Sequence, residues 1–98
     1  MNRQQALQTL SENRNQLKRF LVKDLYLSGS VARDEAIDDS DVDILVEFQP
    51  NAKIGLFQFA RLQRFLSELL EYNVDLATPD ALHKHLKEDI LKEAIHAA

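Results

Sequence analysis

The segment of residues 41–48, DVDILVEF, constrains the fold more than any other part of the chain. Side chains of a β-strand point alternately to its two faces, and here one face is wholly apolar. That face carries Val42, Ile44, Val46 and Phe48, and the opposite face carries Asp41, Asp43, Leu45 and Glu47. Pro50 and Asn51 follow and end the segment. We therefore predict a strand over residues 41–48 with one buried face.

Apolar residues recur at helical spacing in three other segments. The stripe in residues 4–21 consists of Leu7, Leu10, Leu17 and Leu21, and the stripe in residues 55–71 of Leu56, Phe59, Leu62, Leu66 and Leu69. Residues 79–95 carry a third stripe of Leu82, Leu86, Ile90, Leu91 and Ile95. Steps of three and four residues place such side chains on one side of an α-helix. These segments are predicted to be helices, the last one either single or divided.

Two short apolar runs complete the predicted elements. Residues 25–27 (LYL) and 73–77 (NVDLA) read as strands, and Ser30 is placed to cap a short helix after the first of them. The element order α-β-α-β-α-β-α predicts an α/β fold, in which helices pack on a small mixed or parallel sheet of three or more strands. The whole chain of 98 residues is expected to form one domain.

The composition excludes several classes of protein. A net charge of −4 argues against non-specific binding of nucleic acid, because such binding needs a basic surface. The absence of cysteine excludes disulfides and thiolate metal sites. No apolar run reaches the ~18 residues of a membrane span, and the N-terminus does not resemble a signal peptide. We expect a cytoplasmic protein that binds no membrane and makes no direct contact with nucleic acid.

Asp41 and Asp43 are the first candidates for chemistry. They lie two residues apart on a predicted strand, so both carboxylates leave the same face. Two such carboxylates repel each other when they are ionised, and a divalent cation such as Mg²⁺ relieves that repulsion. Nine aspartates in 98 residues give about one Asp-x-Asp by chance, and this chain holds a second one that begins at Asp39. A polar strand edge or loop is therefore an open alternative for the pair alone.

Asp75 lies in the predicted strand of residues 73–77, between two apolar residues that point to the other face. An aspartate in that setting is costly to desolvate without a partner. If this strand pairs beside residues 41–48, Asp75 reaches the face that carries Asp41 and Asp43. An aspartate on an edge strand that faces solvent is the alternative.

The candidate nucleotide-binding residues are Gly29, Ser30, Arg33 and Ser40. Gly29 and Ser30 follow a strand and open a helix, where backbone N–H groups attract anions and glycine permits a phosphate to approach closely. Arg33 lies one turn further, and its planar guanidinium suits a phosphate. An ordinary turn and a surface arginine are the alternatives. Beside three carboxylates, this set is what nucleotidyl transfer from a nucleoside triphosphate with Mg²⁺ needs.

The segment LSGSVARDEAIDDSDVDILVEF, residues 27–48, resembles the signature of the DNA polymerase β-like nucleotidyltransferases. Within that superfamily the chain is similar to the minimal nucleotidyltransferase (MNT) family, whose members are small single-domain antitoxins. The likeness runs through nearly the whole chain, including VDLATPDAL at residues 74–82 and ILKEAI at residues 90–95. One residue departs from the pattern, since Asp34 stands where many relatives have glycine.

The resemblance implies an activity, ligands and a partner. Such proteins are typically encoded beside a HEPN-type ribonuclease toxin, and the expected reaction transfers AMP from ATP to a tyrosine of that toxin. By the same resemblance, Asp41 and Asp43 would bind Mg²⁺. Asp75 would complete the metal triad and act as or position the general base, while Gly29 and Ser30 would hold the triphosphate.

Two other functions stay open at this point. The fold could mask the toxin by binding without catalysis, or it could transfer a nucleotide to a small molecule. The intact Asp41, Asp43 and Asp75 favour an enzyme over a mask. Additional apolar residues in the predicted helix of residues 55–71 indicate either an interface or packing between the sheet and another helix. A homodimer and a mixed assembly with the toxin are both compatible with the sequence.

Overall fold

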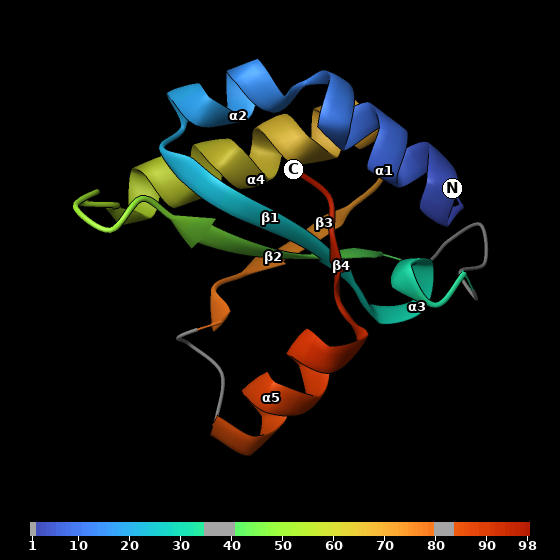
Figure 1. Ribbon diagram of the computed structural model, residues 1–98. Helices are drawn as coiled ribbons and strands as arrows, with labels where there is room; N and C mark the ends of the chain where they lie inside the picture. Colours follow the sequence, from blue (N-terminus) through green and yellow to red (C-terminus); the bar gives the residue numbers. More distant parts are fainter. Residues whose placement is uncertain (1, 35–40, 80–83) are drawn as a thin grey trace.

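The computed structural model describes residues 2–34, 41–79 and 84–98 and shows a four-stranded sheet with helices packed on it (Figure 1). The helices are α1 (Arg3–Glu12), α2 (Arg14–Arg19), α3 (Gly29–Ala32), α4 (Leu56–Leu70) and α5 (Lys84–Glu93). The strands are β1 (Val22–Ser28), β2 (Val42–Phe48), β3 (Val74–Ala77) and β4 (Ile95–His96). Among the described residues, none of the helices combines the length and apolar character that crossing a lipid bilayer requires.

The sheet is mixed and has the strand order β3-β2-β1-β4. β2 pairs with β1 in antiparallel and with β3 in parallel orientation, and β4 pairs antiparallel with β1. Parallel neighbours need a crossover connection, which α4 supplies between β2 and β3. The structure thus confirms the expected α/β fold with a small mixed sheet.

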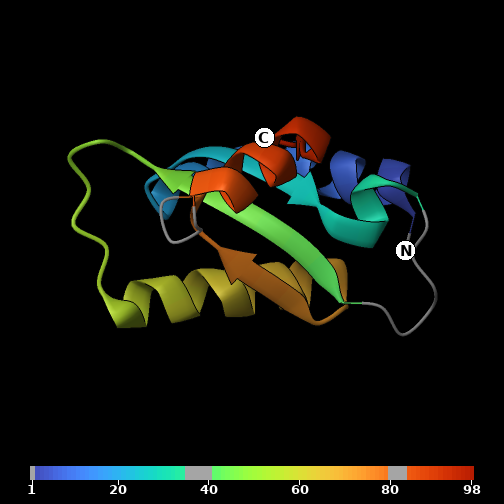
Figure 2. The ribbon, with the colours of Figure 1, turned by 90° about the horizontal axis from the view of Figure 1, so that it is seen from below.

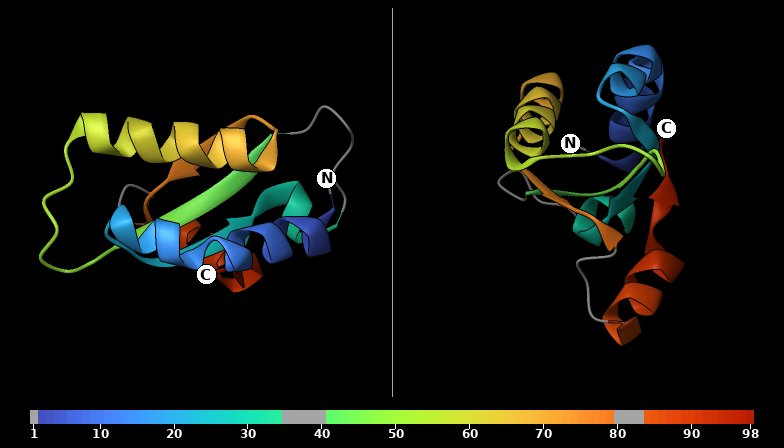
Figure 3. Two further views of the ribbon diagram at one scale, coloured as in Figure 1. Left: turned by 90° about the horizontal axis from the view of Figure 1, so that it is seen from above. Right: turned by 90° about the vertical axis from the view of Figure 1, so that its left-hand side faces the viewer.

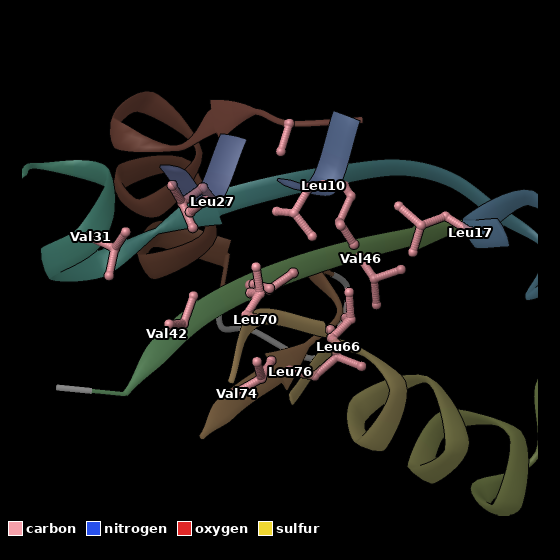
Figure 4. Packing of buried hydrophobic residues seen from close by; sticks show 14 of the residues in the cluster. Leu10, Leu17, Leu27, Val31, Val42, Val46, Leu66, Leu70, Val74 and Leu76 are labelled. Carbon is pink, nitrogen blue, oxygen red and sulfur yellow. The ribbon is translucent and has the colours of Figure 1, made fainter. Parts of the chain in front are cut away.

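The hydrophobic core lies between one face of the sheet and the helices α1, α2 and α4, whereas α5 lies on the opposite face (Figures 2 and 3). The helices contribute Leu10, Leu17, Leu62, Leu66 and Leu70, and β2 contributes Val42, Ile44 and Val46. Figure 4 labels six of them, Leu10, Leu17, Leu66, Leu70, Val42 and Val46. All eight side chains are at most 2% exposed. The alternation predicted for residues 41–48 is therefore confirmed.

The N-terminal helical segment is divided, contrary to the single helix expected for residues 4–21. α1 and α2 are separated by Asn13, whose backbone has φ −106° and ψ 19°. The side-chain Nδ2 of Asn13 donates to the carbonyl oxygen of Thr9 at 2.8 Å, and such local hydrogen bonds compete with the regular helix. Leu21 lies beyond α2 with φ 64° and is 40% exposed, so it is not part of the buried stripe.

The C-terminal segment ends in a strand, although the helix was expected to continue to residue 95. α5 stops at Glu93, and β4 then pairs with the free edge of β1. The amide of Ala97 donates to the carbonyl of Leu25 at 2.7 Å, and the amide of Leu25 donates to the carbonyl of Ala98 at 2.8 Å. These bonds satisfy edge groups of β1 that helical spacing of apolar residues does not reveal.

The turn after β1 differs from expectation in its capping residue. Ser28, not Ser30, occupies the N-cap position of α3, and Ser30 lies inside this short helix. The Ser28 hydroxyl is turned to β2, where it donates to the backbone carbonyl of Asp43 at 3.3 Å. After α3, Asp34 has φ 58°, in the left-handed region that glycine enters without strain. Asp34 therefore holds a backbone conformation that a glycine would adopt more readily.

The apolar residues of α4 divide between packing and exposure. Phe59, Phe65 and Leu69 pack against the core and are partly buried, which agrees with the packing alternative for this helix. Leu56 and Phe57 are 81% and 83% exposed. Leu56, the first residue of the predicted apolar stripe, is therefore not part of the core.

Two leucines of α4 give a matched test of this core. We predict that Leu66→Ala lowers the free energy of unfolding by about 2–5 kcal/mol, because it removes a fully buried side chain and leaves a cavity. Leu56→Ala, at an exposed position of the same helix, should change it by less than about 0.5 kcal/mol. Urea denaturation of the two variants measures the difference, and equal losses would contradict the described packing.

Candidate active site

Strand register places Asp43 and Asp75 side by side. The two residues are direct partners in the parallel pair of β2 and β3, where the amide of Val42 donates to the carbonyl of Asn73 at 2.9 Å. Val42 and Ile44 are buried in the core, so alternation turns Asp43 to the opposite face of the sheet. The strand pairing on which the interpretation of Asp75 depended is therefore present.

Gly29 lies against the carboxylate of Asp43. It is the first residue of α3 and has φ +69°, a conformation that costs other residues about 1–2 kcal/mol. A Cβ atom at Gly29 would overlap Oδ2 of Asp43 and would lie 2.9 Å from its Cγ. The glycine thus meets two requirements, a left-handed backbone and the close approach of an acidic side chain.

A cavity of about 250 Å³ joins these residues on the face of the sheet that lies opposite the core. Its polar lining consists of Ser28, Gly29, Arg33, Asp43, Asp75 and Glu93, and its apolar lining of Ile44, Leu45, Ala77 and Ile90. Four of the candidates from the sequence are among these residues. Asp41 is exposed just before β2 and Ser30 is half-buried within α3, and neither lines the cavity. The candidate Ser40 and the neighbouring Asp39 lie outside the described residues.

The pKa of the Asp43 carboxyl is raised above its ordinary value. Burial is the largest cause, and the negative charges of Asp75 and Asp41 add to it, while the positive charge of Arg33 opposes the rise. Asp41 therefore acts on the site through its charge although it does not line the cavity. A carboxylate that is difficult to ionise among other carboxylates is stabilised when a cation binds nearby.

The donor atoms of this site suit a hard divalent cation. Asp43 and Asp75 offer carboxylate oxygens on adjacent strands, and one or two carboxylates commonly hold Mg²⁺ together with water and substrate phosphates. Within residues 2–34, 41–79 and 84–98, no three acidic or histidine side chains converge into a complete metal cluster. The site thus fits a cation that phosphate oxygens help to coordinate, and the metal-binding roles of Asp41, Asp43 and Asp75 stay a prediction.

α5 supplies a wall of the cavity that the sequence did not reveal. Ile90 and Glu93 lie about one helical turn apart, and Oε2 of Glu93 is 3.6 Å from Nη1 of Arg33. In the sequence, Ile90 belongs to an apolar stripe, which indicates only burial. Nothing in the pattern around Glu93 indicates that it lines a cavity. Ser28 was also missed, although its place directly before Gly29 could have indicated it.

The charge cluster leads to a pH-dependent prediction. Because the pKa of Asp43 is higher in the folded protein than in the unfolded chain, its ionised form destabilises the fold at neutral pH, and this effect disappears as the pH falls through the raised pKa. We predict that Asp43→Asn melts at a higher temperature than the wild type at neutral pH in EDTA. The difference should shrink toward about pH 4, near the ordinary pKa of aspartate. Thermal melts across this range measure the difference in melting temperature. An Asp43→Asn variant that melts at a lower temperature than the wild type at every pH would refute the raised pKa of Asp43.

Gly29→Ala and Gly55→Ala form a matched pair that tests the contact with Asp43. Gly55 has φ −83°, and no atom of the described chain beyond its sequence neighbours lies within 4 Å of a Cβ built there. Gly55→Ala should therefore change the free energy of unfolding by less than about 1 kcal/mol. Gly29→Ala should cost at least about 1–2 kcal/mol, because backbone conformation and crowding both oppose it. Denaturant titrations measure the free energy of unfolding of both variants. A Gly29→Ala variant as stable as the wild type would contradict the close approach of Gly29 to the carboxylate of Asp43.

Comparison with known proteins relates this chain to nucleotidyltransferases. The sequence profile of the nucleotidyltransferase domain family matches residues 7–96. Protein adenylyltransferase MntA of Thermococcus cleftensis is 35% identical over 88 residues, which cover 89% of this chain and 87% of that protein. A provisionally named protein adenylyltransferase of Methanocaldococcus jannaschii is 38% identical over 91 residues, which cover 85% of this chain and 96% of that protein.

Solved structures agree on the fold. A provisionally assigned minimal nucleotidyltransferase has a TM-score of 0.81 at 34% identity, over 97% of this chain and 95% of that one. Two other structures show likeness of fold alone. A toxin-antitoxin structure with AMP-PNP has a TM-score of 0.67 at 21% identity, over 88% of this chain and 73% of that one. A structure of tri-AMPylated Shewanella oneidensis HEPN toxin in complex with MNT antitoxin has a TM-score of 0.59 at 18% identity, over 91% of this chain and 71% of that one. Since the family profile spans nearly the whole chain and relatives exceed 30% identity over most of it, this chain belongs to the nucleotidyltransferase family.

Proposed function

We propose that this nucleotidyltransferase transfers AMP from ATP to a tyrosine of a HEPN-type ribonuclease toxin, in a reaction that depends on Mg²⁺. Two relatives that match most of the chain are named protein adenylyltransferases, one of them provisionally. A chain of the same fold occurs with a tri-AMPylated HEPN toxin, and another occurs in a toxin-antitoxin structure with AMP-PNP, an analogue of ATP. These likenesses support a protein acceptor and an adenine nucleotide.

The observation that carries the proposal is the convergence of Gly29, Asp43 and Asp75 on one cavity. The three residues come from α3, β2 and β3, so the fold itself brings them together. Gly29 is partly exposed and lies against the carboxylate of Asp43, in the cavity that Asp75 also lines. Phosphate and cation must meet beside such carboxylates in nucleotidyl transfer. We assign Ser30 and Arg33 to the triphosphate as well, together with Ser40.

The reaction requires the phenolic oxygen of a tyrosine to attack the α-phosphorus of ATP. The bond from that oxygen to phosphorus forms, the bond from the α-phosphorus to the oxygen bridging to the β-phosphate breaks, and pyrophosphate leaves. A phenol has a pKa of about 10, so a base or a metal must assist the loss of its proton at neutral pH. We assign the base to Asp75, which is exposed on β3 beside Asp43. Asp43 and Asp75 would hold Mg²⁺ together with the phosphate oxygens, and the negative charge of Asp41 would favour the cation there. The bound cation would supply positive charge to those oxygens.

The positions of the two tyrosines of this chain indicate that the residue that accepts AMP lies in another protein. Tyr26 lies on β1, where its ring meets the ring of His96 at a centroid distance of 5.4 Å. Tyr72 packs against the hydrophobic core. Neither residue lines the cavity. The hydroxyl that attacks ATP is therefore assigned to the partner toxin.

Removal of one carboxylate separates catalysis from binding. We predict that Asp75→Asn still forms a complex with the toxin but transfers AMP at least about 100-fold more slowly, because it loses the base. Asp89→Asn makes the same change in charge at an exposed position of α5 and should act like the wild type. Mass spectrometry of the toxin, after incubation with ATP, Mg²⁺ and each form of the protein, detects added AMP.

Three outcomes of this experiment are informative. Added AMP with the wild type and with Asp89→Asn, but not with Asp75→Asn, supports the proposal. A toxin that is silenced at a one-to-one ratio without any gain in mass would show that this protein acts as a mask. Transfer of AMP by Asp75→Asn at the rate of the wild type would show that Asp75 takes no part in the reaction.

A further inference from the structure

An ion pair borders the cavity, between Arg33 after α3 and Glu93 at the end of α5. The two side chains line the cavity, and Nη1 of Arg33 lies 3.6 Å from Oε2 of Glu93. The side chains are 45% and 64% exposed. The contact therefore joins the two helices at a place where solvent and a ligand can reach both groups.

Arg33 acts on two carboxylates at once. Its positive charge opposes the rise in the pKa of Asp43, and it also pairs with Glu93. Asp75 adds a third negative charge to the same cavity. Each of these carboxylates repels an anionic ligand, and among the described residues that line the cavity Arg33 is the basic one.

The length and exposure of the ion pair between Arg33 and Glu93 indicate that a ligand can displace it. Charge-assisted hydrogen bonds that fix a guanidinium are typically about 2.7–2.9 Å long and often bidentate. The contact between Arg33 and Glu93 is longer and joins half-exposed side chains, and pairs of this kind contribute little to stability. A triphosphate, with several charged oxygens, is the better partner for the planar fork of an arginine.

We propose that Glu93 is an internal competitor of the nucleotide: its carboxylate and the phosphates of ATP bind the guanidinium of Arg33 in exchange for each other. This inference rests on the proposed function, because it takes Arg33 as a contact of the triphosphate. Glu93 lowers the affinity of the protein for ATP by occupying the guanidinium of Arg33. When the triphosphate binds, the ion pair between the end of α3 and α5 is broken.

The test compares Glu93→Gln with Glu88→Gln, which makes the same change in charge at an exposed position of the same helix. Isothermal titration with Mg²⁺-ATP, and separately with inorganic triphosphate, measures affinity without any need for the toxin. Glu93→Gln should bind both probes about two- to fivefold more tightly than the wild type, the range expected from loss of an exposed ion pair. Glu88→Gln should bind like the wild type. In an Arg33→Ala background, the gain from Glu93→Gln should fall to the level of this control.

The results separate this inference from the proposed function. Weaker binding by Glu93→Gln would overturn the inference, because Glu93 would then hold Arg33 in position for the nucleotide. Unchanged affinity, or a gain that persists without Arg33, would also overturn it while leaving the proposed function intact. A wild type that binds neither probe would refute the proposed function and this inference together.

Discussion

The alternation of side chains along β2 is the constraint on which the rest of the structure depends. Val42, Ile44 and Val46 face the helices of the core, and the residues between them, Asp43 and Leu45, face the opposite side. A shift of one residue would turn Asp43 into the core and the apolar residues out of it. One strand therefore fixes the core and the acidic site together.

The site also carries features that oppose stability. The pKa of Asp43 is raised by burial and by neighbouring carboxylates, so the ionised side chain is unfavourable in the folded protein. Gly29 approaches this carboxylate so closely that no other residue fits without displacement. Perturbed carboxylates in a cavity are typical of functional sites, because binding of a cation and an anionic substrate compensates the cost.

The parts of the fold that could be predicted from the sequence depend on local periodicity. The alternation in residues 41–48 and the helical stripes predicted the mixed α/β architecture, and the shared strand face predicted that Asp75 lies beside Asp43. The parts that were missed depend on single hydrogen bonds or on distant contacts. The break at Asn13 coincides with a side-chain hydrogen bond to Thr9, and β4 pairs with backbone groups at the edge of β1. The α5 wall of the cavity required tertiary packing, which no spacing encodes.

Gly29, Asp43 and Asp75 line one cavity, which we propose to be the site for a divalent cation and a nucleotide. Paramagnetic Mn²⁺ can take the place of Mg²⁺, and its effect on amide signals of isotope-labelled protein, titrated together with ATP, maps where it binds. We predict that the signals of these three residues broaden first, while that of Phe57, exposed at the start of α4, stays sharp. Broadening centred on other acidic residues, such as Glu68, or none at all, would contradict a cation site at these residues.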